Sequence, residues 1–104
     1  MTNEVIATDP FGKTIHLLPE ILFAEREANE NYDDAATVIK KPAMLVEVNE
    51  NNERQLYYFR SVGWNSTLLI TVRSNNGRWE AYNCIKNPSS KTLSSILKKG
   101  KQIL

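Results

Sequence analysis

Several side chains in this sequence could exchange protons or hold a phosphate group. Histidine is the residue type whose ordinary pKa lies near neutrality, and His16 is the only histidine of the chain. Glu80 is the only carboxylate among residues 54–104 and could act as a base. Arginine keeps its charge and binds phosphate oxygens through paired N–H groups, so Arg60 and Arg73 are candidates for stabilising negative charge. The candidate catalytic set is completed by two tyrosines that could stack on planar rings or donate a proton, Tyr58 and Tyr82.

Each of these residues also has a simpler structural interpretation. His16 stands among apolar neighbours in the run IHLL, where a histidine at the edge of a core is common. Glu80 could form a cross-strand ion pair with Arg73 or Arg60. Arginines often lie on a solvated strand face, and strand tyrosines often pack in a core. The sequence leaves both interpretations open.

Composition excludes several classes of protein. The chain has 104 residues, of which 41% are hydrophobic and 24% charged, as in a single globular domain. It has no apolar run long enough to span a membrane and no signal peptide at its start. With one cysteine and one histidine it forms neither an internal disulfide nor a clustered zinc site, and we expect no metal or cofactor. We therefore expect a cytoplasmic protein.

The charges are distributed unevenly along the chain. Residues 1–53 hold four basic and eleven acidic side chains, a net charge of −7, whereas residues 54–104 hold nine basic and one acidic, a net charge of +8. A basic half indicates an anionic partner, because basic side chains neutralise phosphates and release counterions. An acidic helical layer that covers a basic sheet would explain the same pattern. The candidate phosphate-binding residues of the basic half are Arg78, Lys86, Lys91, Lys98 and Lys99.

The periodicity of apolar residues predicts helices first and strands afterwards. An extended lead-in ends in a turn at residues 9–12, and helices are expected at Pro19–Glu30, Asp33–Lys41 and from Ser89 to near Gly100. Between them, a period of two predicts strands at Met44–Asn49, Arg54–Val62, Ser66–Arg73 and Arg78–Ile85, with a hairpin at Asn75-Asn76-Gly77. The expected fold is therefore α+β: two N-terminal helices packed on a four-stranded antiparallel meander sheet, with a short C-terminal helix. It forms a single domain over residues 1–104, in which 1–42 are the acidic helical part and 43–104 the basic sheet part.

Alternation along the strands sorts side chains onto two faces of that sheet. Leu68, Ile70 and Val72 are expected opposite Leu69, Thr71 and Arg73. In the last strand, Trp79, Ala81 and Ile85 are expected opposite Arg78, Glu80, Tyr82 and Cys84. The strand Arg54–Val62 is half apolar on both sides. If Tyr57 and Phe59 point into the core, Tyr58 and Arg60 join Arg73, Glu80 and Tyr82 on the open face.

Several stretches resemble the phage-associated branch of the barnase–EndoU–colicin–RelE superfamily of metal-independent ribonucleases. The resemblance covers nearly the whole chain and is carried by ATDPFGKTIHL, NYDDAATVIKKPAML, QLYYFRS, LLITVRSNNGRWEAYNC and ILKKGKQIL. Two positions depart from the family pattern. Asn31 stands where a basic residue usually precedes the helical tyrosine, and Glu80-x-Tyr82 replaces a threonine-x-tyrosine pattern.

The resemblance implies a small metal-independent endoribonuclease, either phage-encoded or delivered as a toxin domain. Its RNA, a transfer RNA or a messenger RNA, would lie across the open sheet face, and a cognate inhibitor or a host protein could be a further partner. One alternative is a non-enzymatic domain of the same fold that binds a protein or a nucleic acid. A second alternative is an inhibitor whose acidic helical face mimics nucleic acid through Glu25, Glu27, Glu30, Asp33 and Asp34.

Overall fold

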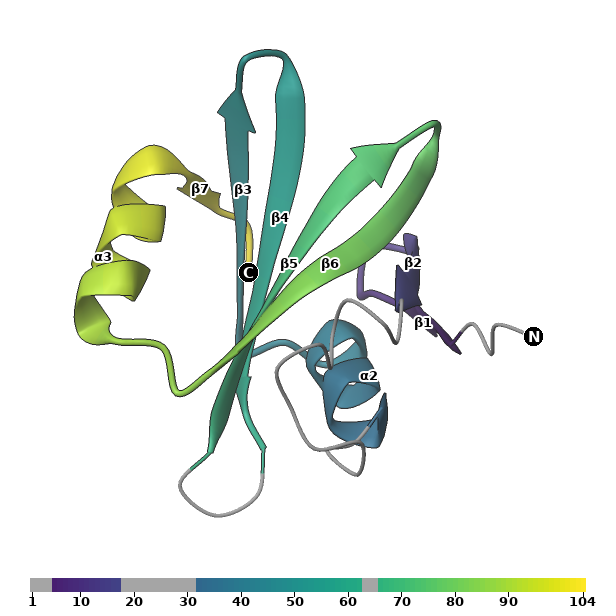
Figure 1. Ribbon diagram of the computed structural model, residues 1–104, viewed down its shortest axis with the longest axis horizontal. Coiled ribbons are helices and arrows are strands. Elements are labelled where there is room, and N and C mark those ends of the chain that lie inside the picture. The colour runs from purple at the N-terminus through teal and green to yellow at the C-terminus, as the bar shows by residue number, and fades with distance from the viewer. Residues whose placement is uncertain (1–4, 18–31, 63–65) are drawn as a thin grey trace.

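The strands that the structure describes form a single mixed sheet, and the two described helices lie on either side of it. The computed structural model describes residues 5–17, 32–62 and 66–104. The described elements are β1 (Val5–Thr8), β2 (Thr14–Leu17), α2 (Tyr32–Lys40), β3 (Met44–Glu50), β4 (Glu53–Ser61), β5 (Thr67–Asn75), β6 (Arg78–Lys86), α3 (Ser90–Lys99) and β7 (Lys101–Gln102). The helix expected at Pro19–Glu30 falls outside these residues. In Figure 1, α2 and α3 lie on opposite sides of the sheet.

The prediction of a four-stranded antiparallel sheet under two N-terminal helices is wrong. The sheet has seven strands within the described residues, in the order β1-β2-β6-β5-β4-β3-β7. The N-terminal segment, which the sequence predicts to be extended, folds into the β1–β2 hairpin. Strand β2 then pairs with β6 in parallel. At the other edge, β7 pairs with β3. Strands of four and two residues carry too little periodicity for the sequence to show that they join the sheet.

Local sequence signals explain the central elements. Pro42 follows α2 and prevents its continuation. The β5–β6 hairpin turns through Asn76 and Gly77, whose φ angles of 52° and 80° are those of a tight turn that favours this residue pair. Ser89 caps α3, since its hydroxyl accepts a hydrogen bond from the backbone N–H of Thr92 at 3.1 Å.

Apolar side chains cover both faces of the sheet, because each face receives a helix. The larger core packs against α2 and is built from residues such as Ile15, Leu56, Ile70, Ala35 and Val38. A smaller core on the other face joins α3 to the sheet through Val46, Val48, Leu69 and Ile96, with Leu93, Met44, Tyr57 and Phe59 packed around it. The mixed character of β4 follows from this arrangement, since both of its faces are partly covered.

Tyr58 belongs to the larger core. Its side chain is fully buried, and its hydroxyl donates a hydrogen bond of 2.7 Å to Oδ2 of Asp9. Oδ1 of Asp9 accepts from the backbone N–H groups of Phe11 and Lys13, so this carboxylate also fixes the β1–β2 turn. The contact joins residues that are 49 positions apart and fastens the edge hairpin to the centre of the sheet.

A β-bulge in β6 changes which side chains face α3. Thr71 pairs with Asn83 and Val72 pairs with Ala81, so Tyr82 is an extra residue on the bulged strand. The expected alternation therefore ends at Tyr82. Cys84 packs against the core on the α2 side, whereas Ile85 lines a pocket on the α3 side.

Candidate functional site

Four of the predicted catalytic residues share the face of the sheet on which α3 lies. Ile15 and Leu17 are buried on the α2 side, so His16 between them faces the α3 side. His16 is the register partner of Glu80 in the parallel β2–β6 pair, and Arg73 is the partner of Glu80 in the antiparallel β5–β6 pair. Neighbouring strands lie about 4.8 Å apart, so the three positions form a row across the sheet. With Gln55 and Tyr82 they make up what we call the open face.

Glu80 has defined partners at the end of the β5–β6 hairpin. Its Oε1 accepts a hydrogen bond of 3.0 Å from the side-chain amide of Asn75, and its Oε2 lies 3.7 Å from Nε of Arg78. The side chain of Glu80 is only 14% exposed, although both partners are surface residues. The cation that pairs with Glu80 is therefore Arg78, within its own strand, rather than Arg73 or Arg60. The contacts hold the carboxylate toward Asn75 and Arg78, on the strand position that pairs with Arg73.

Arg73 stacks on an aromatic ring that is itself hydrogen-bonded. Its guanidinium carbon lies 4.6 Å from the centroid of the Tyr82 ring, within the range of a cation–π interaction. Nε2 of Gln55 donates a hydrogen bond of 3.1 Å to the Tyr82 hydroxyl, and the Tyr57 hydroxyl donates one of 3.0 Å to Oε1 of the same glutamine. The chain of contacts crosses three strands and positions an exposed arginine over a fixed ring.

The pKa values of the two tyrosines are raised. Burial is the main cause for Tyr57 and for Tyr82, and Arg73 partly opposes the rise at Tyr82. Both hydroxyls therefore keep their protons at neutral pH. Tyr82 accepts a hydrogen bond from Gln55, so its own proton is available for an acceptor on the open face.

Tyr58 and Arg60 do not join this face. The arrangement in which they lie beside Arg73 is wrong, because β4 directs Tyr57 and Phe59 toward α3 and the alternate residues toward α2. Tyr58 is buried against Asp9, and Nη1 of Arg60 donates a hydrogen bond of 2.7 Å to the backbone carbonyl of Lys41. Both residues therefore have structural roles on the opposite side of the sheet.

The predicted phosphate-binding cations do not form one patch. Arg78 lies beside Glu80 at the hairpin, and Lys86 ends β6. Lys91 is in the first turn of α3, whereas Lys98 and Lys99 are in its last turn. Nζ of Lys99 lies 3.8 Å from a carboxylate oxygen of Glu50. Lys91 is the member of this set that lines a pocket.

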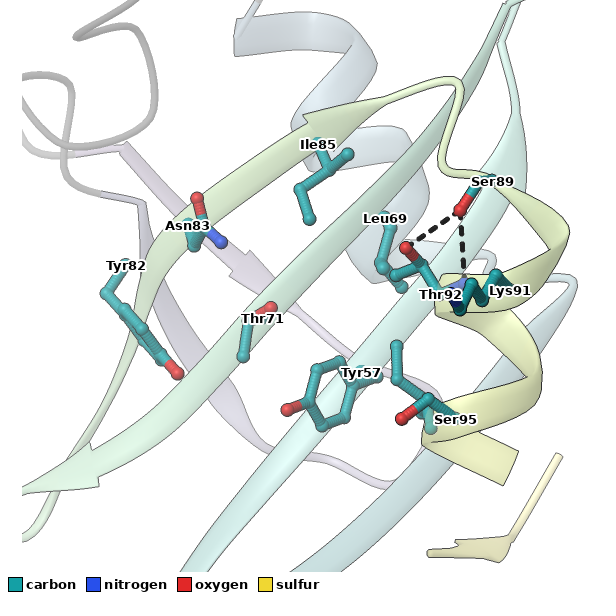
Figure 2. A pocket seen from close by; sticks show the side chains of 11 residues that line it. Tyr57, Leu69, Thr71, Tyr82, Asn83, Ile85, Ser89, Lys91, Thr92 and Ser95 are labelled. Atoms are coloured by element: carbon teal, nitrogen blue, oxygen red, sulfur yellow. Dashed lines mark hydrogen bonds between the residues drawn. The ribbon is translucent and has the colours of Figure 1, made fainter. Parts of the chain in front are cut away.

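A pocket of about 460 Å³ lies between the N-terminal half of α3 and strands β4–β6. We call it the α3 pocket. Figure 2 shows the hydroxyls of Tyr57 and Tyr82 turned toward one another near Thr71, with Ser95 of α3 on the opposite side. The lining residues are Tyr57, Leu69, Thr71, Tyr82, Asn83, Ile85, Ser89, Lys91, Thr92, Ser95 and Ile96. Tyr82 lines the pocket and also contacts Arg73, so the pocket adjoins the open face at this residue.

Sequence reasoning missed the polar residues that support the site. The period-two pattern places Gln55 and Tyr57 in a strand but does not show which face of the sheet each occupies. Nothing in the local sequence indicates a functional role for Asn83. The alternation of β4 contains no signal for α3, because the helix is far away in the sequence. The tyrosines on both sides of β4 were the available indication that both faces are partly covered.

Comparison with protein-family models, curated proteins and solved structures finds no match to this chain. No described helix is long and apolar enough to cross a membrane. Among residues 5–17, 32–62 and 66–104, no three side chains of the His, Cys, Asp or Glu type gather as a metal site would require.

Proposed function

We propose that this protein is a small endoribonuclease that cleaves single-stranded RNA on the open face without a metal ion. The observation that carries the proposal is the row of His16, Glu80 and Arg73 on three adjacent strands. It places two groups able to exchange protons, His16 and Glu80, on neighbouring strands, with a cation that binds phosphate, Arg73, next to Glu80. The net charge of +8 on residues 54–104 and the resemblance of the sequence to metal-independent ribonucleases support the same function.

The reaction needs no group beyond these residues and the RNA itself. Glu80 takes the proton of a ribose 2′-hydroxyl, and the 2′-oxygen forms a bond to the adjacent phosphorus. The bond from phosphorus to the 5′-oxygen breaks, and His16 delivers a proton to that oxygen. The products are a 2′,3′-cyclic phosphate and a 5′-hydroxyl. Arg73 stabilises the negative charge on the phosphorus oxygens, and Tyr82 donates a hydrogen bond to one of them.

The test is an RNA cleavage assay in EDTA with analysis of the product ends. We expect single-stranded RNA to give 2′,3′-cyclic phosphate ends, whereas DNA of the same sequence stays intact because it lacks the attacking hydroxyl. The variants His16→Asn and Glu80→Gln should each lose about 10²- to 10⁴-fold in rate. Glu50→Gln is the matched control, since it also removes an ion-paired carboxylate, at a position outside the open face.

Two results would contradict the proposal. One is cleavage that EDTA abolishes, and the other is cleavage that persists unchanged in both His16→Asn and Glu80→Gln. RNA that stays intact but binds in a salt-sensitive manner would identify a non-enzymatic nucleic-acid-binding domain instead. Among the acidic residues of the nucleic-acid mimic, Glu25, Glu27 and Glu30 lie outside the described residues, and Asp33 and Asp34 belong to α2. No structural observation favours that alternative.

A further inference from the structure

The α3 pocket arises because α3 covers only part of the sheet. The helix packs through Leu93 and Ile96 on Val46, Val48 and Leu69, near the β3 edge. Among the described residues, the side chains of β6 on the α3 side are not part of the core that α3 makes with the sheet. The chain crosses from β6 to α3 at residues 87–89, which leaves a recess beside this crossing. Its volume of about 460 Å³ is within the range of roughly 300–1,000 Å³ that is typical of small-molecule sites.

The walls of the pocket suit a flat, partly polar ring. Leu69, Ile85 and Ile96 supply apolar surface, and Tyr57 and Tyr82 supply two aromatic rings. Aromatic side chains are the usual partners of an unstacked nucleobase.

Polar side chains of the lining complement the edge of such a ring. The bulge in β6 brings the Asn83 side chain to the same face as Tyr82, which regular alternation would not do. An asparagine amide offers a donor and an acceptor side by side and can therefore bind a base edge through two hydrogen bonds. The hydroxyls of Thr71 and Ser95 add further partners.

The charge of the pocket fits a nucleotide rather than a cationic ligand. The lining residues that the structure describes include no carboxylate and one cation, Lys91. An anionic phosphate would therefore meet a cation and no carboxylate among these lining side chains, and a cationic ligand would find no counterion among them. The pocket also adjoins Arg73 through the shared residue Tyr82.

We propose that the α3 pocket binds one unstacked base of the RNA strand whose phosphate Arg73 holds. The proposal rests on the proposed function and gives it base selectivity. Glu80 and Asn83 lie opposite Arg73 and Thr71, which are two residues apart on β5, so the two positions are roughly 7 Å apart at about 3.3 Å per residue, a span that one extended nucleotide can bridge. The amide of Asn83 reads the edge of the base while Tyr82 contacts its ring.

The first test measures binding without cleavage. The four nucleoside 3′-monophosphates are titrated into the protein and followed by NMR, with ribose 5-phosphate as the probe that lacks a base. We expect one or two of the four to bind at millimolar concentration, to shift the Asn83 and Tyr82 resonances, and to bind at least 10-fold more tightly than ribose 5-phosphate. Equal binding of ribose 5-phosphate would overturn the proposal, and so would no binding of any monophosphate.

Two variants locate the binding. Ser95→Trp fills the pocket from α3, and its matched control Ser94→Trp adds the same ring at the neighbouring exposed position outside the lining. Asn83→Ala removes the side-chain amide at an exposed position. It provides the test of the pocket if Ser95→Trp does not fold. We expect binding to weaken at least 10-fold in Ser95→Trp and in Asn83→Ala and to stay unchanged in Ser94→Trp. Unchanged binding in Ser95→Trp and Asn83→Ala would overturn the proposal.

The cleavage assay separates this proposal from the proposed function. Cleavage by Ser95→Trp and Asn83→Ala with the base preference of the unaltered protein would overturn the base pocket and leave the nuclease in place. Monophosphate binding that depends on Asn83, in a protein that does not cleave RNA, would support the pocket as a nucleotide site and overturn the nuclease.

Discussion

The guanidinium of Arg73 lies 4.6 Å from the centre of the Tyr82 ring, and the hydroxyl of that ring accepts a hydrogen bond from Gln55. The contact with the Tyr82 ring limits the orientations of the Arg73 guanidinium. The guanidinium stays accessible to solvent, because Arg73 is exposed. An arginine that is held in this way loses less conformational entropy when it binds a phosphate. The contacts between β4, β5 and β6 therefore prepare Arg73 to bind a phosphate on the open face.

Replacing Tyr82 should separate the contribution of its ring from that of its hydroxyl. Tyr82→Phe keeps the ring beneath Arg73, so RNA binding in EDTA should fall by no more than about 3-fold. Tyr82→Ala should lose roughly 5- to 150-fold in RNA affinity, the equivalent of about 1–3 kcal/mol of base stacking. Fluorescence anisotropy with a labelled single-stranded RNA measures both changes.

An aromatic residue outside the open face provides the control for Tyr82. Phe11 is 50% exposed and has Nζ of Lys13 at 5.5 Å from its ring centroid. Phe11→Ala should therefore bind RNA as the unaltered protein does. Equal losses in Phe11→Ala and Tyr82→Ala would show that RNA does not use the open face.

Tyr58 should matter for stability and not for activity. Tyr58→Phe leaves the buried Asp9 carboxylate with one hydrogen-bond donor fewer, and we expect the free energy of unfolding to fall by about 1–3 kcal/mol. Tyr57→Phe removes a hydroxyl that bonds to the neutral Gln55 and should cost about 0.5–1.5 kcal/mol. Urea unfolding measures both values. A Tyr58→Phe protein that is as stable as the original would show that the contact with Asp9 contributes nothing.

Alkaline pH should weaken the fold through Tyr58. Burial, followed by the hydrogen bond to Asp9 and its charge, raises the pKa of Tyr58 above the ordinary value of 10.0. Above about pH 10 the unfolded chain therefore loses the Tyr58 proton while the folded protein keeps it, so stability falls as pH rises. The contribution is fully present below pH 10 and is lost at up to about 1.4 kcal/mol per pH unit above it.

Urea unfolding of the protein and of Tyr58→Phe between about pH 9 and about pH 11.5 isolates this contribution. The raised pKa values of Tyr57 and Tyr82 act in the same direction in both proteins and cancel in the comparison. We expect the unaltered protein to lose stability more steeply with pH than the variant does. Parallel curves would refute the assignment to Tyr58.

Gly100 should be intolerant of a side chain. A Cβ atom there would lie 2.5 Å from Cγ1 of Val46 and 2.7 Å from the carbonyl oxygen of Glu47, because the chain passes directly over β3 between α3 and β7. We expect Gly100→Ala to cost about 1–3 kcal/mol and to accelerate hydrogen exchange at Ile103, whose N–H donates to Leu45. Gly77→Ala is the control, since it meets only backbone strain at a φ of 80°, and exchange at Ile103 should not change.

The central elements of the fold were predictable because their signals are local. The Asn76-Gly77 turn, the stop at Pro42 and the period-two strands placed α2, α3 and β3–β6 close to where they occur. The β1–β2 hairpin and β7 join the sheet through pairings between distant parts of the chain, which no local pattern encodes. The sequence therefore predicted a sheet of the wrong size and connectivity.

The candidate site was predictable only in part, for the same reason. Arg73, Glu80 and Tyr82 fall on one face through alternation within a hairpin, which sequence reasoning could follow. The faces of β4 depend on where α3 packs, so the assignment of Tyr58 and Arg60 had no local signal. The periodicity of the sequence likewise gives no sign of the bulge at Tyr82. This bulge places the Asn83 side chain on the α3 side of the sheet.

The most direct test of the proposed nuclease on the open face compares the RNA cleavage rates of Arg73→Ala and Arg60→Ala with EDTA present. Both variants remove one strand arginine from the basic half. Arg73 lies in the row with Glu80 and His16, whereas Arg60 binds a backbone carbonyl on the opposite side of the sheet. We expect Arg73→Ala to lose about 10²- to 10³-fold in cleavage rate and Arg60→Ala to cleave at the rate of the unaltered protein. Equal loss in the two variants, or full activity in Arg73→Ala, would contradict the proposed nuclease.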